Sequence, residues 1–211
     1  MLKLKYSKGN AIFLEAAVKG LISKAEELLE ECKKTDFDVG ALPISMEDLD
    51  GLRYFIDNPD DFDLELSTPE KAYARNLQEF GEVSMPPPSY ISFYEYCIEN
   101  GIPVHGIDMD DEHYTMAYCE HVSGLQWIRQ SFLEKKLLKT KIEASTPEEF
   151  AVKWDERINH LSGYSDLERH RERVMGKNLA RLSKSGTVFS IVEVERMDGV
   201  VEELKRNGYT S

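Results

Sequence analysis

Short apolar runs that alternate with amphipathic helical patterns are the feature of this sequence that most constrains its fold. Residues 37–44 (FDVGALPI), 102–108 (IPVHGID) and 187–194 (TVFSIVEV) are such runs. A run that is apolar on both faces is typical of a strand buried in a parallel sheet. Because helical patterns separate these runs, the sequence predicts an α/β fold: a mainly parallel central sheet with helices on both faces.

The N-terminal part predicts one strand followed by one long helix. Residues 2–6 alternate between apolar and polar side chains, and Gly9 and Asn10 interrupt the pattern. From Leu14 to Cys32 apolar residues recur every three or four positions, which indicates a helix with one buried face.

Local capping signals place further elements. Ser45, with Asp48 three residues later, predicts a helix start, and Ser67 before Pro69 and Glu70 predicts another. The stretch 61–66 (DFDLEL) alternates as an edge strand does. Other helices are predicted after the proline run 86–88, over 111–139 with a kink at 123–124, from 146, from 165 to 186 and over 200–205.

The chain of 211 residues suits a single domain, residues 1–211. A chain of this length buries roughly 70–75% of the surface that its unfolded form exposes, so it needs no disulfide or structural metal. The segment 111–163 reads as helix after helix, which predicts a helical insertion or lid over the sheet.

The formal net charge of −13 argues against nucleic acid as a partner, because phosphate backbones are bound through Lys and Arg. One basic stretch stands out, from Arg169 to Arg181. It is either a solvated helix face or a local anion site.

The three cysteines, Cys32, Cys97 and Cys119, have no CxxC spacing, and all three fall in helical patterns. We therefore expect them to be small buried hydrophobic residues rather than a disulfide framework or a zinc site. The opening MLKLKYSKGN has no apolar run of signal-peptide length, and no stretch of 18 apolar residues occurs. The expectations are a cytoplasmic location and no membrane partner.

Ligands of open parallel sheets bind beyond the carboxyl ends of the strands. The richest such position follows residues 102–108. Its carboxylates and imidazole could hold a divalent cation, or could simply cap a helix N-terminus. The candidate metal ligands are Asp108, Asp110, Asp111 and His113. We expect His105 to be a core or edge residue and His160 to lie in a loop.

The sequence has no Gly-rich phosphate loop, no HExxH helix and no nucleophile elbow. No complete catalytic set and no cofactor site are therefore predicted, and an enzyme is the less favoured class.

The C-terminal third resembles a known family. The run HRERVMGKNLARLSKSGTVFSIVEVERMDGVVEELKR resembles the closing segment of the TraB/PrgY family, which is related to the Tiki proteins. That family has an Arg-rich helix of the pattern ERDRYMAENL, then a strand, a Gly-x-x-His turn and a short helix. The matching helix residues are Arg171, Glu172, Arg173, Met175, Asn178 and Leu179. Asp108 and Asp110 match the acids of the family's Asp-Arg-Asp turn.

The departures from the family pattern bear on function. The resemblance aligns the two family histidines with Ile12 and Arg196, the glutamate of the second strand with Leu42 or Pro43, and the arginine of the Asp-Arg-Asp turn with Met109. In relatives, the histidines and the glutamate are suspected metal ligands or catalytic groups of a metal-dependent hydrolase. Isoleucine cannot coordinate a metal and arginine stays cationic, so the alignment implies that this site does not form here.

The resemblance therefore implies a noncatalytic TraB/PrgY-like domain that acts as a binding or assembly module. Its predicted pocket, for a small anionic or zwitterionic ligand, combines Arg171, Arg173 and Arg196 with Asp108 and Asp110 opposite them; the alternative is that these charges pair with one another. A competing hypothesis is a metal-dependent hydrolase that uses the acidic cluster 108–113.

Self-association is a third possibility, since aromatic residues are enriched in interfaces. We favour a place in the helix core over a homodimer interface for the aromatic residues Tyr90, Phe93, Tyr94, Tyr96, Tyr114, Tyr118 and Trp127.

Overall fold

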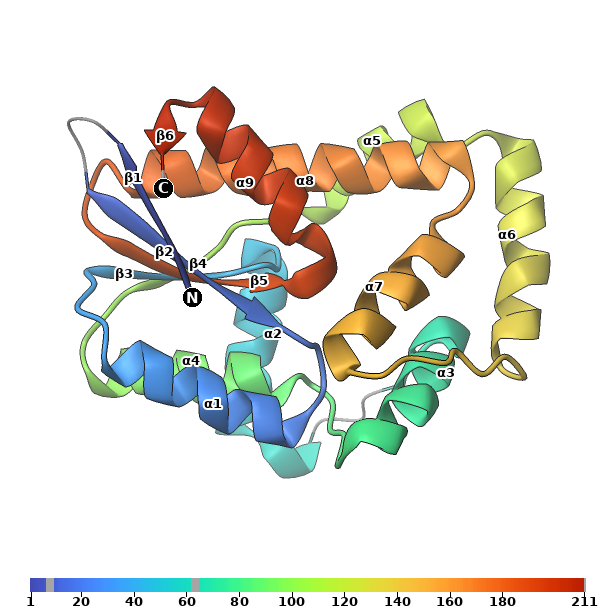
Figure 1. Ribbon diagram of the computed structural model, residues 1–211, viewed down its shortest axis with the longest axis horizontal. Coiled ribbons are helices and arrows are strands. Elements are labelled where there is room, and N and C mark those ends of the chain that lie inside the picture. Colours follow the sequence, from blue (N-terminus) through green and yellow to red (C-terminus); the bar gives the residue numbers. More distant parts are fainter. Residues whose placement is uncertain (7–9, 62–64, 211) are drawn as a thin grey trace.

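A six-stranded sheet forms the centre of the molecule, in the strand order β4-β3-β5-β2-β1-β6 (Figure 1). The computed structural model describes residues 1–6, 10–61 and 65–210. The strands are β1 (Leu2–Tyr6), β2 (Ala11–Ala17), β3 (Val39–Leu42), β4 (Val104–Gly106), β5 (Val188–Glu193) and β6 (Tyr209–Thr210).

Four neighbouring strands, β4, β3, β5 and β2, run parallel, and β1 and β6 add an antiparallel edge. The three apolar runs became β3, β4 and β5, as predicted. All six residues of β5 are buried, because β5 has a strand on each side and helices above and below it. The predicted fold class is confirmed.

Residues 11–17 form a strand, and the prediction of one helix from Leu14 to Cys32 was wrong. Ile12, Phe13 and Leu14 are consecutive and all buried, which a central strand allows and a one-sided helix does not. Helix α1 begins only at Ile22 and ends at Lys33. Gly20, with φ of 103°, makes the turn between them in a conformation that favours glycine. The predicted break at Gly9 lies outside the described residues.

Helices cover both faces of the sheet. On one face, α1, α2 (Met46–Asp57) and α4 (Pro88–Glu99) enclose a core around Phe93, Phe189 and Ile191. On the other face, α8 (Ser162–Leu182) and α9 (Met197–Arg206) pack on Ile12 and Val188. Figure 1 shows these two layers below and above the strands.

The remaining helices extend the molecule beyond one end of the sheet (Figure 1). Helices α3 (Thr68–Leu77), α6 (Gly124–Leu137) and α7 (Pro147–Ile158) share a core that includes Tyr73, Phe150 and Trp154, while α5 (Asp111–His121) packs along α8. Residues 111–163, all described, contain helices and connections but no strand, as expected.

Several predicted boundaries shift. The kink at 123–124 is a full break, because Ser123 caps a separate helix through a capping box with Gln126. Helix α8 begins at Ser162 rather than Ser165, and the last helix begins at Met197 rather than Val200. The caps predicted at Ser45 and Ser67 are confirmed. Of the predicted edge strand 61–66, residues 62–64 lie outside the described residues, and 65–66 are not in a strand.

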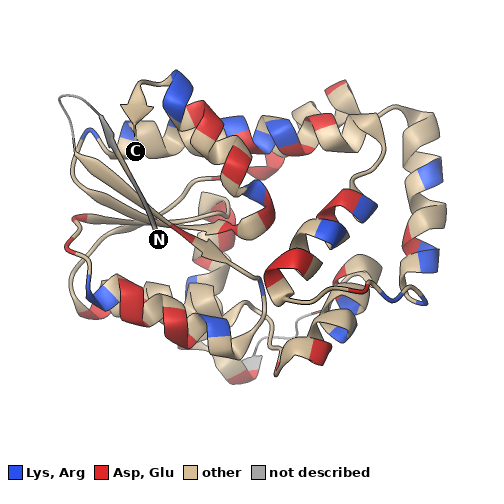
Figure 2. Cartoon of the chain, viewed as in Figure 1, with Lys and Arg blue, Asp and Glu red and all other residues tan. Residues whose placement is uncertain are grey.

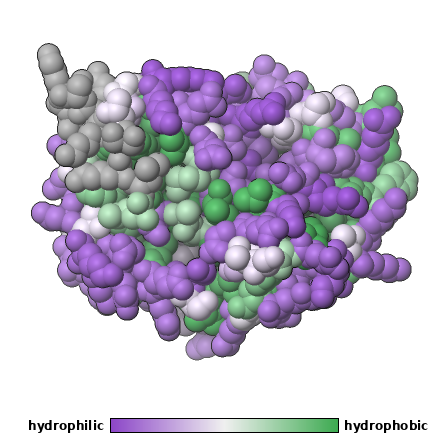
Figure 3. All heavy atoms as spheres, viewed as in Figure 1, coloured by the Kyte–Doolittle hydropathy of each residue, from purple (hydrophilic) through white to green (hydrophobic). Residues whose placement is uncertain are grey.

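Helix α6 turns an apolar ridge toward solvent. Leu125, Ile128 and Phe132 follow one another at three- and four-residue spacing, and all three are exposed. Figure 3 shows hydrophobic atoms on the surface at the edge where α6 lies. The opposite side of α6 buries Gln130 and Leu137.

The aromatic residues predicted for the core divide between core and surface. On α4, Tyr90 and Phe93 are buried, and Tyr94 and Tyr96 pack against them, as favoured. Trp127 of α6 is 58% exposed, and Tyr114 is exposed as well.

The cysteines divide in the same way. Cys32 and Cys97 are buried neighbours of one core, where burial raises the pKa of both thiols to about 12. Cys119 is exposed, so the prediction that it is buried was wrong. Within the described ranges, every helix is too short or too polar to traverse a bilayer.

Candidate functional site

A cavity of about 410 Å³ lies beyond the carboxyl ends of β2 and β5, between α3, α7 and α8. We call it the sheet-end cavity. The connection after β2 contributes Lys19, and the end of β5 contributes Glu193, Glu195 and Arg196. Its position follows the general rule for parallel sheets, in which the loops after the strands are free to carry polar groups.

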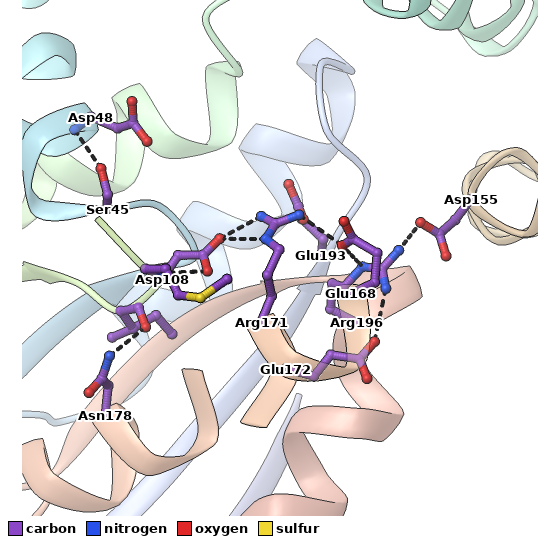
Figure 4. A network of polar contacts seen from close by, with 12 residues as sticks. Ser45, Asp48, Asp108, Asp155, Glu168, Arg171, Glu172, Asn178, Glu193 and Arg196 are labelled. Atoms are coloured by element: carbon purple, nitrogen blue, oxygen red, sulfur yellow. Dashed lines mark hydrogen bonds and ion pairs between the residues drawn. The ribbon is translucent and has the colours of Figure 1, made fainter. Parts of the chain in front are cut away.

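Arg196 forms the centre of a buried ion network beside this cavity (Figure 4). It lies in the 3-10 turn Val194–Arg196 directly after β5, and its side chain is only 5% exposed. Its guanidinium contacts Asp155 of α7, Glu172 at 2.9 Å and Glu168 at 3.4 Å. Figure 2 shows acidic and basic segments next to each other where α7 approaches this turn. Burial lowers the pKa of Arg196 to about 10, so it remains a cation at neutral pH.

Arg171 of α8 forms the second half of the network. Its Nε donates to Asp108 at 3.0 Å, and its Nη1 donates to Glu168 at 2.8 Å (Figure 4). Glu168 thus bridges the two arginines. Both guanidinium groups are already bound by carboxylates, which is the self-pairing alternative left open by the sequence.

Two members of the predicted pocket lie elsewhere. Arg173 is exposed, because two residues along a helix turn its side chain about 200° away from that of Arg171. Asp110 is the N-cap of α5: it accepts from the backbone amide of His113 at 2.8 Å and contacts the imidazole at 2.7 Å. The structure therefore brings Asp108, Arg171 and Arg196 together and leaves Asp110 and Arg173 outside the network.

The acidic residues that follow β4 have different structural roles. Asp108 binds Arg171, Asp110 caps α5, and Asp111 occupies the first turn of that helix. Capping is thus the structural role of Asp110, as the helix-cap interpretation expected. Among the residues that the structure describes, no group of three or more His, Cys, Asp or Glu side chains is arranged to hold a metal ion.

Sequence reasoning missed the acids Glu193 and Glu195. Glu193 is buried and accepts a hydrogen bond from the hydroxyl of Tyr90 at 3.0 Å. Burial, with the nearby charge of Glu193, raises the pKa of Glu195 to about 8. The available signal was the pair of acids at the end of the most apolar strand of the chain. Acidic side chains are rarely buried unless they are paired, so acids in a buried strand indicate a candidate site.

Tyr73 supplies the cavity with an unpartnered polar group. The residue is 8% exposed and lies on α3, and its hydroxyl has no hydrogen-bond partner among the described residues. Buried polar groups are nearly always hydrogen-bonded, because leaving one unpaired costs about 1–3 kcal/mol. This hydroxyl is therefore an unsatisfied buried group next to the cavity.

The residues aligned with the family's histidines are not equivalent in space. Arg196 does lie at the carboxyl edge of the sheet. Ile12, however, pairs with Val188 near the start of β2 and is fully buried, at the opposite end of that strand from the cavity. The side chain of Ile12 is therefore no part of the sheet-end cavity. Lys19, which follows the end of β2, lines the cavity instead.

A second cavity, of about 580 Å³, lies on the other side of Asp108. We call it the α5–α8 cavity, after the helices that form most of its wall. Met46, Met109 and Met116 supply apolar lining, while Glu120 and His170 are among its polar residues.

Comparison of the chain with protein-family models and with curated protein sequences found no match.

Proposed function

We propose that this chain is a noncatalytic binding domain of the TraB/PrgY type, and that its sheet-end cavity takes a small cationic ligand such as an amine. The observation that carries the proposal is the surplus of carboxylates around the cavity. The two arginines are paired within the network, whereas Glu193 and Glu195 face the cavity with Lys19 as the nearby cation.

The pKa of Glu195 supports this choice of ligand. A carboxyl group is neutral at pH 7 when burial and a neighbouring carboxylate disfavour its charge. A cation placed beside the pair would reverse that balance, so its binding would release a proton from Glu195. Tyr73 lines the same cavity, and its enclosed hydroxyl has no hydrogen-bond partner among the described residues.

The anionic or zwitterionic ligand expected from the sequence required free guanidinium groups to bind its negative charge. Arg171 and Arg196 each contact at least two carboxylates. An anion would have to displace these carboxylates and leave them buried without a partner, which is costly. We therefore propose a cation in place of the anion.

The test is a binding titration with a simple diamine. Putrescine is the probe, 1,4-butanediol is its uncharged match, and inorganic phosphate is the anion. The proposal expects heat of binding and a raised melting temperature with putrescine, and neither with the other two compounds. Affinity should increase as the pH rises toward about 8, where Glu195 ionises.

Substitutions test whether putrescine binds in the sheet-end cavity. Glu195→Gln should weaken putrescine binding at least tenfold, and the exposed Glu202→Gln of α9 should leave it unchanged. Binding of phosphate that disappears in Arg171→Met would overturn the proposal in favour of an anion site. Failure of putrescine to bind, or equal binding by the Glu195→Gln variant, would also overturn it.

A further inference from the structure

The exposed ridge of α6 is apolar and has positive charge beside it. Leu125 is 72% exposed, and Ile128 and Phe132 are exposed on the same side of the helix. The helix and the residues directly after it also carry four exposed cations: Arg129, Lys135, Lys136 and Lys139. The ammonium of Lys135 lies 6.0 Å from the centre of the Phe132 ring, so charge and apolar surface are adjacent. Figure 2 shows the basic segments along α6.

These four cations lack acidic partners within the molecule. In the described part of the chain none of them forms an ion pair, whereas Lys141, which follows shortly after, contacts Glu79 at 2.8 Å. The whole chain has a formal net charge of −13, so positive charge beside an exposed apolar ridge is a local exception. A surface of this kind favours a partner surface that is both apolar and acidic.

A groove with that character lies on the same chain, between α2 and α4. We call it the α2–α4 groove; its volume is about 370 Å³. Its apolar lining consists of Ile56, Tyr94 and Ile98, and the Ile98 side chain is 54% exposed. A groove between two helices is a form that accepts the apolar side of a third helix.

The charged residues of the α2–α4 groove are mostly acidic. Asp57, Glu95 and Glu99 line it, and all three are exposed. Arg53 is the one cation of the lining, and its Nε lies 3.9 Å from a carboxylate oxygen of Asp57. Among the described residues, Glu95 and Glu99 form no ion pair. The groove therefore offers two carboxylates without a partner to a basic surface.

The ridge and the groove of one molecule belong to different parts of the fold. Helix α6 packs against α3 and α7 and turns its ridge to solvent, whereas α2 and α4 cover one face of the sheet. The ridge therefore reaches a groove of this kind only on another molecule.

We propose that the chain associates with itself head to tail, with the ridge of α6 of one copy seated in the α2–α4 groove of the next. The apolar side chains of the ridge then pack on those of the groove, and the four cations of α6 face its carboxylates. Because the two surfaces differ, each copy keeps one of them open, so association can continue beyond a dimer. Both surfaces are small, so the contact is weak and the chain is monomeric in dilute solution.

Two other occupants of the ridge fit the observations less well. An anionic membrane attracts the cations of α6 but repels the rest of a chain whose net charge is −13. Two α6 ridges packed on each other would leave the four cations without carboxylates and the α2–α4 groove uncovered. A second copy that offers its groove satisfies both surfaces.

The experiment measures the molar mass of the purified chain by sedimentation and light scattering at increasing protein concentration. We expect reversible association that continues beyond a dimer. It should weaken when NaCl is raised from about 0.05 M to about 0.5 M, because salt screens the attraction between the charges.

Substitutions on each surface should have the same effect. Phe132→Asp on the ridge and Ile98→Asp in the groove should both stay monomeric where the unaltered chain associates. Met116→Asp is the control, since Met116 is 63% exposed, as Phe132 is, and lies outside both surfaces. Lys136→Glu and Glu99→Lys change only exposed charges and should each weaken association at least tenfold. Unchanged melting temperatures in dilute solution show that the variants are folded.

A mixture of the two monomeric variants distinguishes head-to-tail association from a symmetric contact. Phe132→Asp keeps an intact groove and Ile98→Asp keeps an intact ridge, so together they should form a dimer and no larger species. Association that is lost in Phe132→Asp but retained in Ile98→Asp would mean that α6 pairs with itself, and would overturn the proposal. A chain that stays monomeric at every concentration, or that binds phosphatidylserine vesicles instead, would also overturn it.

Neither surface includes a residue that lines the sheet-end cavity. The self-association and the proposed binding of a cation can therefore fail independently of each other.

Discussion

Arg171 and Asp108 join two segments that are 63 residues apart in the sequence. Arg171 comes from the middle of α8, and Asp108 follows the carboxyl end of β4. The Asp108 side chain is 8% exposed, and Nε and Nη2 of the guanidinium both donate to the same carboxylate oxygen. This contact also forms the partition between the sheet-end cavity and the α5–α8 cavity.

Replacing Asp108 with Ala should destabilise the fold strongly. The change leaves a mostly buried guanidinium with Glu168 as its remaining carboxylate, and breaking a buried pair typically costs about 3–5 kcal/mol. Urea unfolding measures this loss. Glu202→Ala, which removes an exposed partner of Arg206, should cost less than about 1 kcal/mol. Equal effects of the two variants would contradict the importance of the Arg171–Asp108 pair.

Replacing Glu195 with Gln should change how stability depends on pH. The folded chain holds the pKa of Glu195 at about 8, above the ordinary 4.5. Below pH 4.5 the carboxyl is protonated in both the folded and the unfolded chain, so its charge makes no difference to stability between the variant and the unaltered protein. As the pH rises toward about 8, the Glu195 carboxyl ionises in the unfolded chain before it does in the folded one. This lowers the free energy of unfolding of the unaltered protein, whereas the Glu195→Gln variant has no carboxyl to ionise and keeps its stability.

The measurement is the difference in melting temperature between Glu195→Gln and the unaltered chain across that pH range. The difference should increase with pH and level off above about 8. Glu202→Gln, as the exposed control, should show no such trend. A constant difference for Glu195→Gln would show that the pKa of this carboxyl is not raised.

Replacing glycine with alanine at two positions should change the stability in opposite directions. A Cβ at Gly106 of β4 would collide with the backbone carbonyl of Ser45, which cannot move without shifting the start of α2, so Gly106→Ala should cost about 1–3 kcal/mol. Gly51 lies inside α2 with nothing within 4 Å of an added Cβ. Gly51→Ala should therefore stabilise the chain by about 0.5–1 kcal/mol. Chemical denaturation of both variants tests the backbone contact between β4 and α2.

Replacing two phenylalanines of the helical segment with alanine should lower the stability by very different amounts. Phe150 of α7 is fully buried against Tyr73 and Trp154, so Phe150→Ala should cost about 3–5 kcal/mol. Phe132 of α6 is 63% exposed, and Phe132→Ala should change the free energy of unfolding by less than about 0.5 kcal/mol. A large loss for Phe132→Ala would mean that the ridge of α6 is covered in solution, which light scattering would then examine as self-association.

Local signals in the sequence determined the class of fold and many of its elements. The apolar runs of β3 and β5 and the caps at Ser45 and Ser67 depend on neighbours a few residues away, so pattern alone predicts them. The capping role of Asp110 is local for the same reason.

Tertiary structure decided what the local pattern left ambiguous. Residues 14–17 fit the helical period that begins at Leu14, yet they belong to the strand 11–17 because β1 and β5 pair with both edges of that strand. Likewise, a sequence shows that Arg171 and Arg196 are cationic but does not show which carboxylates reach them. Whether a charge binds a ligand or a neighbouring side chain depends on distances between segments far apart in the chain, and only the packing of α7 and α8 against the end of β5 fixes those distances.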